Sequence, residues 1–248
     1  FNQKDYLCAL FSAQYCFQKA VEYGLDRDGL YRQILQDGLA FPTLLNERGY
    51  YYTNQGAKSE KAGMQKHPVQ LNPLALLPLY PQITGPTAIA YERRYNITIN
   101  AEQPHFAGWT LAEFLLSGSR MGDSDGWKTD WGNLIRSDLA DSHWIQIYES
   151  SGNNRTFYIT TMAMIAQSLI CNLIDDWFGR LEIARCNPWQ GKILFKNMYS
   201  RLGIIISGEI DPHSAALLLT AWKDCDFEAH GSRIKIKKGE TRTMNLNL

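Results

Sequence analysis

The segment SRIKIKKGETRTMNLNL, residues 232–248, decides the fold class that the sequence predicts. Ile234 and Ile236, and then Met244 and Leu246, are apolar residues at every second position. A period of two is typical of a strand with one buried face. Gly239 separates the two runs and predicts a turn between them. The chain is therefore expected to end on antiparallel strands.

The β-rich pattern begins near residue 179 and continues from there to the end of the chain. It predicts strands over residues 180–184, 192–199, 203–209 and 215–222, ahead of the final segment. We therefore expect residues 179–248 to form a small antiparallel β-sandwich module.

The first two-thirds of the chain has helical periodicity instead. Leu7, Leu10 and Phe17 recur at helical spacing over residues 3–23, and Gly24 follows as a helix-ending glycine. Further helices are predicted over residues 26–39, 84–95, 109–121, 128–139 and 156–177, the last being the longest. We expect residues 1–178 to be a domain of paired helices, which makes the chain mainly α with a β C-terminus.

Composition excludes several classes of function. The 248 residues carry 25 basic and 25 acidic side chains, so no charge excess points to nucleic acid. No apolar run approaches the roughly 20 residues of a membrane span. Five Cys residues lack the spacing of a metal site. We expect no nucleic-acid partner, no membrane insertion, no metal and no cofactor.

Aspartates in the segment GDSDGWKTDW form the densest acidic group, at Asp123, Asp125 and Asp130. Asp-x-Asp spacing occurs in calcium loops, but no further ligands follow at loop spacing. A solvated connection between helices is the favoured interpretation.

Two tripeptides, at Asn96-Ile97-Thr98 and Asn154-Arg155-Thr156, match the acceptor sequence for N-glycosylation. They predict a secreted or extracellular glycoprotein with sugars on Asn96 and Asn154.

Several segments resemble glycoside hydrolase family 65, whose members have a six-hairpin (α/α)6 barrel. DYLCALFSAQYCFQKAVEYGLDRDGLYRQILQDGLAFP (residues 5–42) resembles the stretch that follows the catalytic acid of that family. MQKHPVQLNPLALLPL (64–79), AGWTLAEFLLSGSRMGD (107–123), FYITTMAMIAQSL (157–169) and WQGKILFKNMYSRLGIIISGEID (189–211) resemble later segments in the same order. Related barrels of families 95 and 15 match nearly as well.

The resemblance implies that residues 1–178 are the C-terminal half of such a barrel. It also implies that the general acid lies before residue 1, on an N-terminal portion of the same enzyme that would be the partner of this chain. Lys66 and His67 stand where the family has a Lys-Gln pair that contacts the sugar, so this chain departs from the family at His67.

Other candidate residues come from loops and helix starts. Glycoside hydrolysis needs two carboxyl groups, one as acid and one as base or nucleophile. Glu149, in the polar segment QIYESSGNNRTF, matches the base of related barrels and is expected at the start of the helix that follows it. Trp109 and Thr110 are candidate sugar contacts. Tyr51, in the long aromatic loop 41–66, is a further candidate, or packs against the missing half.

The resemblance leaves the acceptor open between water and phosphate. Thr161, Ala163 and Met164 stand where a phosphorylase would have glycines whose freed N–H groups cradle an anion. This favours an inverting hydrolase acting on an oligosaccharide. A disaccharide phosphorylase and a non-catalytic carbohydrate-binding or scaffold chain remain alternatives.

Overall fold

The computed structural model describes residues 4–57, 66–80, 82–98, 106–141, 143, 146–150 and 155–248. The chain divides into two compact units. The first contains Phe1–Ser117 and Asp130–Met164, and the second contains Gly118–Thr129 and Ile165–Leu248. Each unit has its own interior, and each is described by itself.

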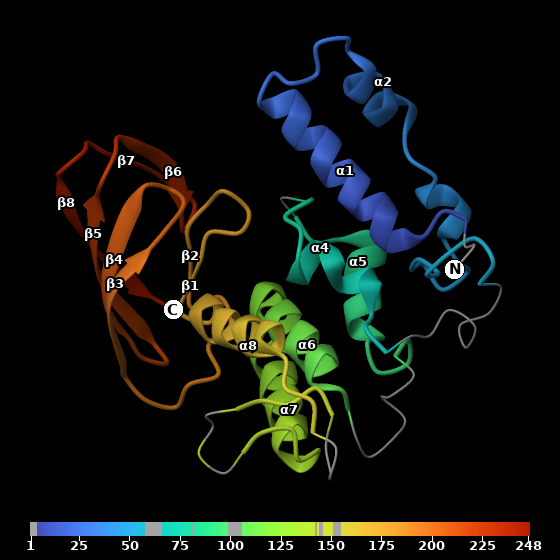
Figure 1. Cartoon of the computed structure of the whole chain (residues 1–248). Helices are drawn as coiled ribbons and strands as arrows, with labels where there is room; N and C mark the ends of the chain where they lie inside the picture. The colour runs from blue at the N-terminus through green and yellow to red at the C-terminus, as the bar shows by residue number, and fades with distance from the viewer. Residues whose placement is uncertain are drawn as a thin grey trace. The chain divides into compact units, whose positions relative to one another are not determined.

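Helices occupy the described chain up to Cys171 (Figure 1). They are α1 (Leu7–Glu22), α2 (Leu30–Asp37), the 3-10 helices η1 (Phe41–Leu44) and η2 (Val69–Leu71), α4 (Asn72–Ala75), α5 (Gly85–Glu92), α6 (Gly108–Met121), α7 (Ser124–Arg136) and α8 (Ile159–Cys171).

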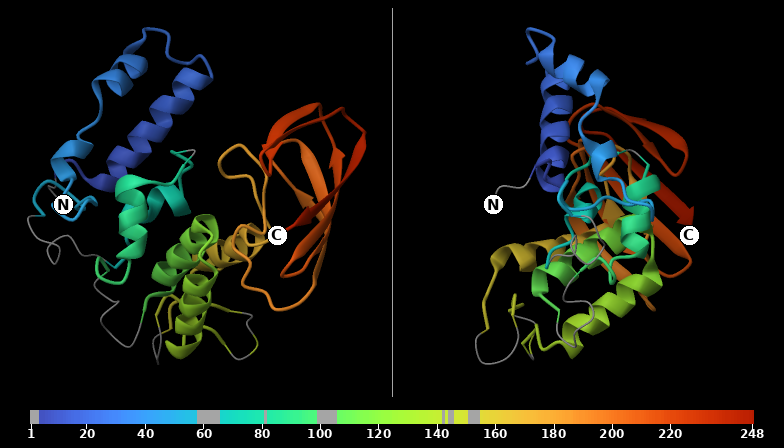
Figure 2. Two further views of the ribbon diagram at one scale, coloured as in Figure 1. Left: turned by 180° about the vertical axis from the view of Figure 1, so that it is seen from behind. Right: turned by 90° about the vertical axis from the view of Figure 1, so that its right-hand side faces the viewer.

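Helices α1 and α2 form a hairpin, as the views of Figure 2 show. Gly24 has φ of 67°, a left-handed conformation that glycine adopts without strain. Its N–H donates to Val21, and the N–H of Leu25 donates to Ala20. This is the Schellman pattern of helix termination, so the predicted role of Gly24 is confirmed.

The first unit has an apolar core at the base of this hairpin. Leu7 and Phe11 of α1 are completely buried against Leu44, Val69 and Leu79. Farther along the hairpin, burial stops: α2 has no buried residue although its apolar side chains lie along one face. Exposed apolar residues gather near its turn, namely Tyr23, Leu25 and Leu30.

Eight antiparallel strands follow the helices within the second unit. They are β1 (Ile174–Asp175), β2 (Glu182–Ile183), β3 (Ile193–Tyr199), β4 (Ile204–Ile210), β5 (Ser214–Ala221), β6 (Cys225–Ala229), β7 (Ser232–Ile236) and β8 (Thr241–Asn247). The main sheet has the order β3-β4-β5-β8, and β1-β2 and β6-β7 form two-stranded sheets.

Alternating side chains of these strands build one apolar core. In β5, Ala215, Leu217 and Leu219 are buried while Ala216 and Leu218 are exposed. Residues of β4, β5, β6 and β7 belong to the same buried cluster. The period-2 pattern therefore has its expected cause, which is a sheet with one face on the core.

The order of helices and then antiparallel strands confirms the coarse fold class. A closed or partial barrel is not established. The helix predicted over residues 156–177 is shorter, because residues from Ile174 onward pair with β2. The longest helix is α1, with 16 residues. The boundary expected near residue 179 stays a proposal, and the β module shares its compact unit with parts of α6, α7 and α8.

Candidate functional site

Glu149 lies in a bend whose backbone is hydrogen-bonded to two other segments. Its N–H donates to the carbonyl of Thr156 at 2.6 Å, and its carbonyl accepts the N–H of Gly108 at 3.1 Å. Its side chain is only 4% exposed. The expected polar turn therefore holds a buried carboxylate rather than a solvated one.

Both carboxylate oxygens of Glu149 face donors from distant parts of the first unit. Oε2 accepts the backbone N–H of Trp109 at 2.7 Å, and Oε1 lies 2.7 Å from the Nζ of Lys66. Glu149 therefore caps the N-terminus of α6, where the helix dipole favours negative charge. The prediction that its carboxylate would sit at the start of the following helix is wrong.

Gly108 makes this arrangement possible. A Cβ at this position would lie 2.1 Å from the carbonyl oxygen of Tyr148 and 3.2 Å from the Cα of Glu149. Real Cβ atoms do not come so close to backbone, so α6 can begin against the Glu149 segment only with glycine at this position.

Lys66 and His67 form the solvent-facing side of the cluster, with side chains 43% and 38% exposed. His67 Nε2 lies 3.6 Å from Oε1 of Glu149, and its ring packs edge-on against Trp109 at 5.9 Å. Burial lowers the pKa of His67, Glu149 opposes this shift, and Lys66 adds to it. His67 is therefore mainly neutral at pH 7, and Lys66 supplies the positive charge.

Thr110 supports this cluster from inside. Its hydroxyl donates to the carbonyl of Lys66 at 2.5 Å, and the residue is completely buried. Thr110 therefore holds the backbone of Lys66 and does not reach the surface in this structure.

A second carboxyl group, Glu113, was missed by the sequence analysis. It is 1% exposed, lies one turn after Trp109 in α6, and receives a hydrogen bond from the Trp109 side chain. Burial raises its pKa to about 8, the Trp109 bond lowers it, and nearby Glu149 raises it. The signal was available: it is the single acidic residue in the apolar run WTLAEFLL.

Tyr51 belongs to a different set of contacts. Its ring packs against Phe11 at 6.3 Å and Phe41 at 5.5 Å. Together with Tyr80 and the start of α5 it lines a pocket of about 390 Å³. Its described neighbours thus differ from those of Glu149.

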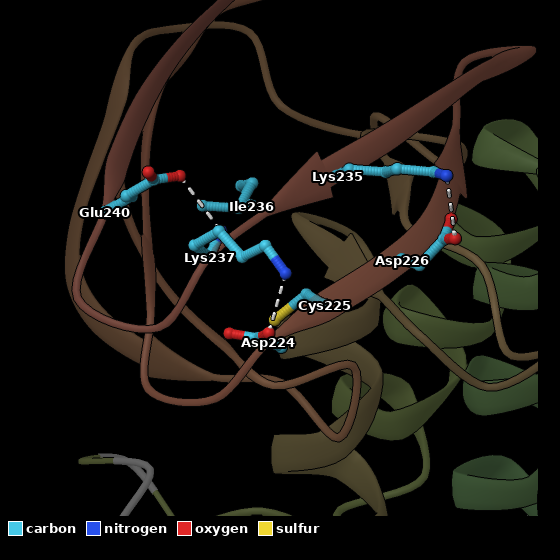
Figure 3. Close-up of a pocket in the computed structure, with 7 residues that line it drawn as sticks. All are labelled: Asp224, Cys225, Asp226, Lys235, Ile236, Lys237 and Glu240. Carbon is cyan, nitrogen blue, oxygen red and sulfur yellow. Dashed lines mark hydrogen bonds and ion pairs between the residues drawn. The ribbon is translucent and has the colours of Figure 1, made fainter.

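A further pocket of about 320 Å³ lies in the β module (Figure 3). Its charged groups pair with each other: Lys237 Nζ lies 2.9 Å from Asp224, and Lys235 Nζ lies 3.7 Å from Asp226. These side chains are largely exposed, so the pocket is a solvated ion-pair surface. It is lined by Asp224, Cys225, Asp226, Lys235, Ile236, Lys237 and Glu240.

The acidic group around α7 is not a single solvated cluster. Asp130 is completely buried, and Arg94 Nε donates to it at 3.1 Å. Asp123 accepts the N–H of Gly126 at 2.8 Å and caps α7. In the described ranges, no three His, Cys, Asp or Glu side chains gather as metal ligands would.

Other predictions concern the surface and the thiols. Asn96 is exposed, whereas Thr98 of the same tripeptide is completely buried. Asn154 lies outside the described residues.

All five cysteines are free thiols. Among the helices that the structure describes, none combines the length and apolarity needed to cross a bilayer.

The site at the start of α6 contains two buried carboxyl groups whose surroundings differ: Glu149 lies beside the Lys66 ammonium, and Glu113 lies beside no cation that the structure describes. Such pairs are typical of acid–base catalysis. The residues that converge there are Lys66, His67, Trp109, Thr110, Glu113 and Glu149.

Comparison with known proteins identifies no family. No family model matches the chain, and no curated protein matches it. A solved structure described as "Putative kojibiose phosphorylase from human microbiome" aligns with 12% identity and a TM-score of 0.43. The alignment covers 65% of this chain and 20% of that one. A TM-score of this size does not define a shared fold, so the side chains must carry the assignment of function.

Proposed function

We propose that this chain carries part of the active site of a carbohydrate-active enzyme that hydrolyses O-glycosidic bonds. In this proposal Glu149 is the general base of an inverting reaction, and Lys66 and His67 bind the sugar above it. One observation supports it most. Lys66, His67 and Trp109, from two segments far from residue 149 in the sequence, lie at the Glu149 carboxylate, and Thr110 holds the Lys66 backbone beside it.

The chemistry of the cluster fits this role. An inverting hydrolase needs a carboxylate to activate water and an acid roughly 6.5–9.5 Å away. The Glu149 carboxylate has one oxygen on a helix N-terminus and one on Lys66. Lys66 and His67 are its exposed neighbours, so a sugar would meet them first. The general acid is proposed to come from an N-terminal portion of the same enzyme.

That partner portion is proposed to pack its helices on the α1–α2 hairpin. The exposed side chains of Tyr23, Leu25 and Leu30 support it, as does the lack of any buried residue in α2. Exposed apolar clusters of this kind mark interaction surfaces. Binding of an apolar dye to the isolated chain, lost in the complete enzyme, is the expected result.

Water is the proposed acceptor rather than phosphate. Thr161, at the position of a cradle glycine, is completely buried. Arg155, a cation that could hold phosphate, has its guanidinium 2.6 Å from Asp138. Lys66, the other candidate cation, has its ammonium 2.7 Å from Glu149, so both cations already face carboxylates.

Carbohydrate binding without catalysis is the second candidate. It is favoured by the burial of Glu149, whose side chain is 4% exposed. A base that cannot reach water would hold α6 in place and do no chemistry.

The test uses the complete protein with maltose and cellobiose, which differ in the anomer of one glycosidic bond. Proton NMR follows the first anomer of glucose released, with and without phosphate. We expect hydrolysis without phosphate and an inverted anomer. Glu149→Gln should lower turnover by about 10²- to 10⁴-fold and preserve binding. The control is Glu209→Gln, which removes an exposed carboxylate paired with Lys192.

Each other outcome selects an alternative. Glucose 1-phosphate formed only with phosphate would indicate a phosphorylase. Binding without cleavage by the unchanged protein would indicate the non-catalytic chain. Unchanged hydrolysis in the Glu149→Gln protein would remove Glu149 from the base role.

We also propose that the protein is secreted and glycosylated at Asn96 and Asn154. The exposure of Asn96 supports the first site. Treatment of the native protein with peptide N-glycosidase should lower its mass, and an unchanged mass would contradict the proposal.

A further inference from the structure

Helix α6 carries a buried acid that the proposed reaction does not yet use. Glu113 is 1% exposed, and its Oε2 atom has no hydrogen-bond partner among the residues that the structure describes. Leaving a buried carboxyl oxygen without a partner is costly, more so when the group is charged. The presence of such a costly group at this position therefore calls for a functional explanation.

Trp109 connects this acid to the Glu149 carboxylate. Its backbone N–H donates to Oε2 of Glu149 at 2.7 Å, and its side chain donates to Glu113. Its ring also packs against His67, with centroids 5.9 Å apart. One residue therefore contacts both carboxyl groups and one exposed residue of the cluster.

The two carboxyl groups have different electrostatic surroundings. Glu149 faces the ammonium of Lys66, and the other groups near Glu113 are Glu149 itself and Tyr6. The pKa of Tyr6 is raised by burial, then by Cys8 and by Glu113. Burial keeps one of the pair protonated near neutral pH, and the repulsion between two like charges adds to this effect. Glu113 is that one, because Lys66 lies on Glu149.

We propose that Glu113 is a positioning residue of the Glu149 site, which accepts the hydrogen bond of the Trp109 side chain and, through Trp109, holds the Glu149 carboxylate. This inference rests on the proposed function, in which Glu149 is the reacting group. Loss of the Glu113 proton would place a second negative charge next to Glu149 and weaken the arrangement.

The first arm of the test needs no activity. Glutamate labelled with ¹³C at the side-chain carboxyl is incorporated into the complete protein, and the carbon shifts are followed from pH 4 to pH 10. We expect one carboxyl to titrate near pH 8 and to disappear from the spectrum in Glu113→Gln. If every carboxyl titrates near its ordinary pKa, the inference is overturned.

A second variant covers the case in which Glu113→Gln does not fold. Trp109→Phe keeps the ring and removes the indole N–H that favours ionised Glu113. The late-titrating carboxyl should then move to a higher pH. An unchanged midpoint would show that Trp109 does not hold Glu113, and would overturn the inference.

The second arm uses hydrolysis of whichever of maltose and cellobiose the protein cleaves. The kcat/KM of the unchanged protein should fall about tenfold per pH unit above the Glu113 midpoint. In Glu113→Gln the fall with this midpoint should vanish and only the fall due to the general acid should remain, whereas a purely structural role would lower stability and leave the profile unchanged. If the alkaline fall of kcat/KM has the same midpoint in Glu113→Gln as in the unchanged protein, the inference is overturned. Normal turnover in Glu149→Gln, with the late titration intact, would instead contradict the proposed function.

Discussion

The Glu149 cluster and the pocket between β6 and β7 are both rich in charge, yet they differ in burial. Asp224, Asp226, Lys235 and Lys237 pair with each other on an exposed surface. Glu113 and Glu149 are 1% and 3% exposed, and the ammonium of Lys66 lies on Glu149. Exposed pairs contribute about 0–1 kcal/mol, whereas buried charges must be compensated. Burial, more than the number of charges, therefore identifies the candidate site.

The largest expected effect contrasts a buried and an exposed aspartate. Asp130 is completely buried against Arg94, and Asp226 meets Arg233 at the surface. Asp130→Asn should lower the free energy of unfolding by about 3–5 kcal/mol, because it leaves a buried guanidinium without its carboxylate. Asp226→Asn should leave the free energy of unfolding nearly unchanged, because solvent screens the exposed pair. Urea unfolding measures both, and equal losses would remove the contrast.

Adding one methyl group tests the close approach at the start of α6. Gly108→Ala forces a Cβ to within 2.1 Å of the Tyr148 carbonyl, so the segment that carries Glu149 must shift. We expect a loss of about 2 kcal/mol in stability. Gly191→Ala is the matched control, since no atom lies within 4 Å of its added Cβ. Thermal unfolding of the two variants measures this loss. A Gly108→Ala protein as stable as the control would contradict the close contact between Gly108 and Tyr148.

Stability should depend on pH through Glu113. Its folded pKa of about 8 lies above the ordinary value of 4.5, so the folded state holds a proton that the unfolded state has lost. The resulting stabilisation is complete at pH values below 4.5. It is lost as the pH rises from 4.5 to about 8, by at most about 1.4 kcal/mol per pH unit.

The measurement is the difference between the unchanged protein and Glu113→Gln across this window, because the difference cancels other titrating groups. The unchanged protein should lose stability relative to the variant as the pH rises. Parallel curves would mean that Glu113 ionises normally in the folded protein.

The smallest effect compares two lysines. Lys66→Met removes the cation from a buried carboxylate, and Lys192→Met removes one from exposed Glu209. Because Lys66 is itself 43% exposed, its loss should lower the free energy of unfolding by only about 1–2 kcal/mol. The loss of Lys192 should have a smaller effect, because solvent screens its pair with Glu209. Chemical denaturation resolves the two, and a larger loss for Lys192 would reverse the comparison.

Local pattern was sufficient for much of the fold. Alternation predicted β5 and β7, and Gly24 predicted the end of α1, because burial on one face and a left-handed glycine leave direct traces in sequence. Local pattern failed where pairing between distant segments determines whether a residue belongs to a helix or a strand. The helix predicted to residue 177 stops at Cys171 because Ile174 pairs with Ile183. Strand β6 was missed because it is only five residues long, although Cys225–Ala229 alternates buried apolar and exposed charged residues.

The candidate site was predictable only in part, for a similar reason. Lys66, His67, Trp109 and Glu149 were named from segments, and they lie together. The capping of helix α6 by Glu149 was not foreseen, since a helix cap supplied from another segment has no local signature. Glu113 was overlooked because its unusual pKa arises from burial, which a single acidic letter in an apolar run only hints at.

The most direct test of the central claim is a crystal structure of the complete Glu149→Gln protein with bound maltose or cellobiose. We expect a glycosidic bond above residue 149, with sugar hydroxyls bonded to Lys66 and His67. A disaccharide bound elsewhere, for example between Tyr51 and Tyr80, with Lys66 and His67 left untouched, would contradict it.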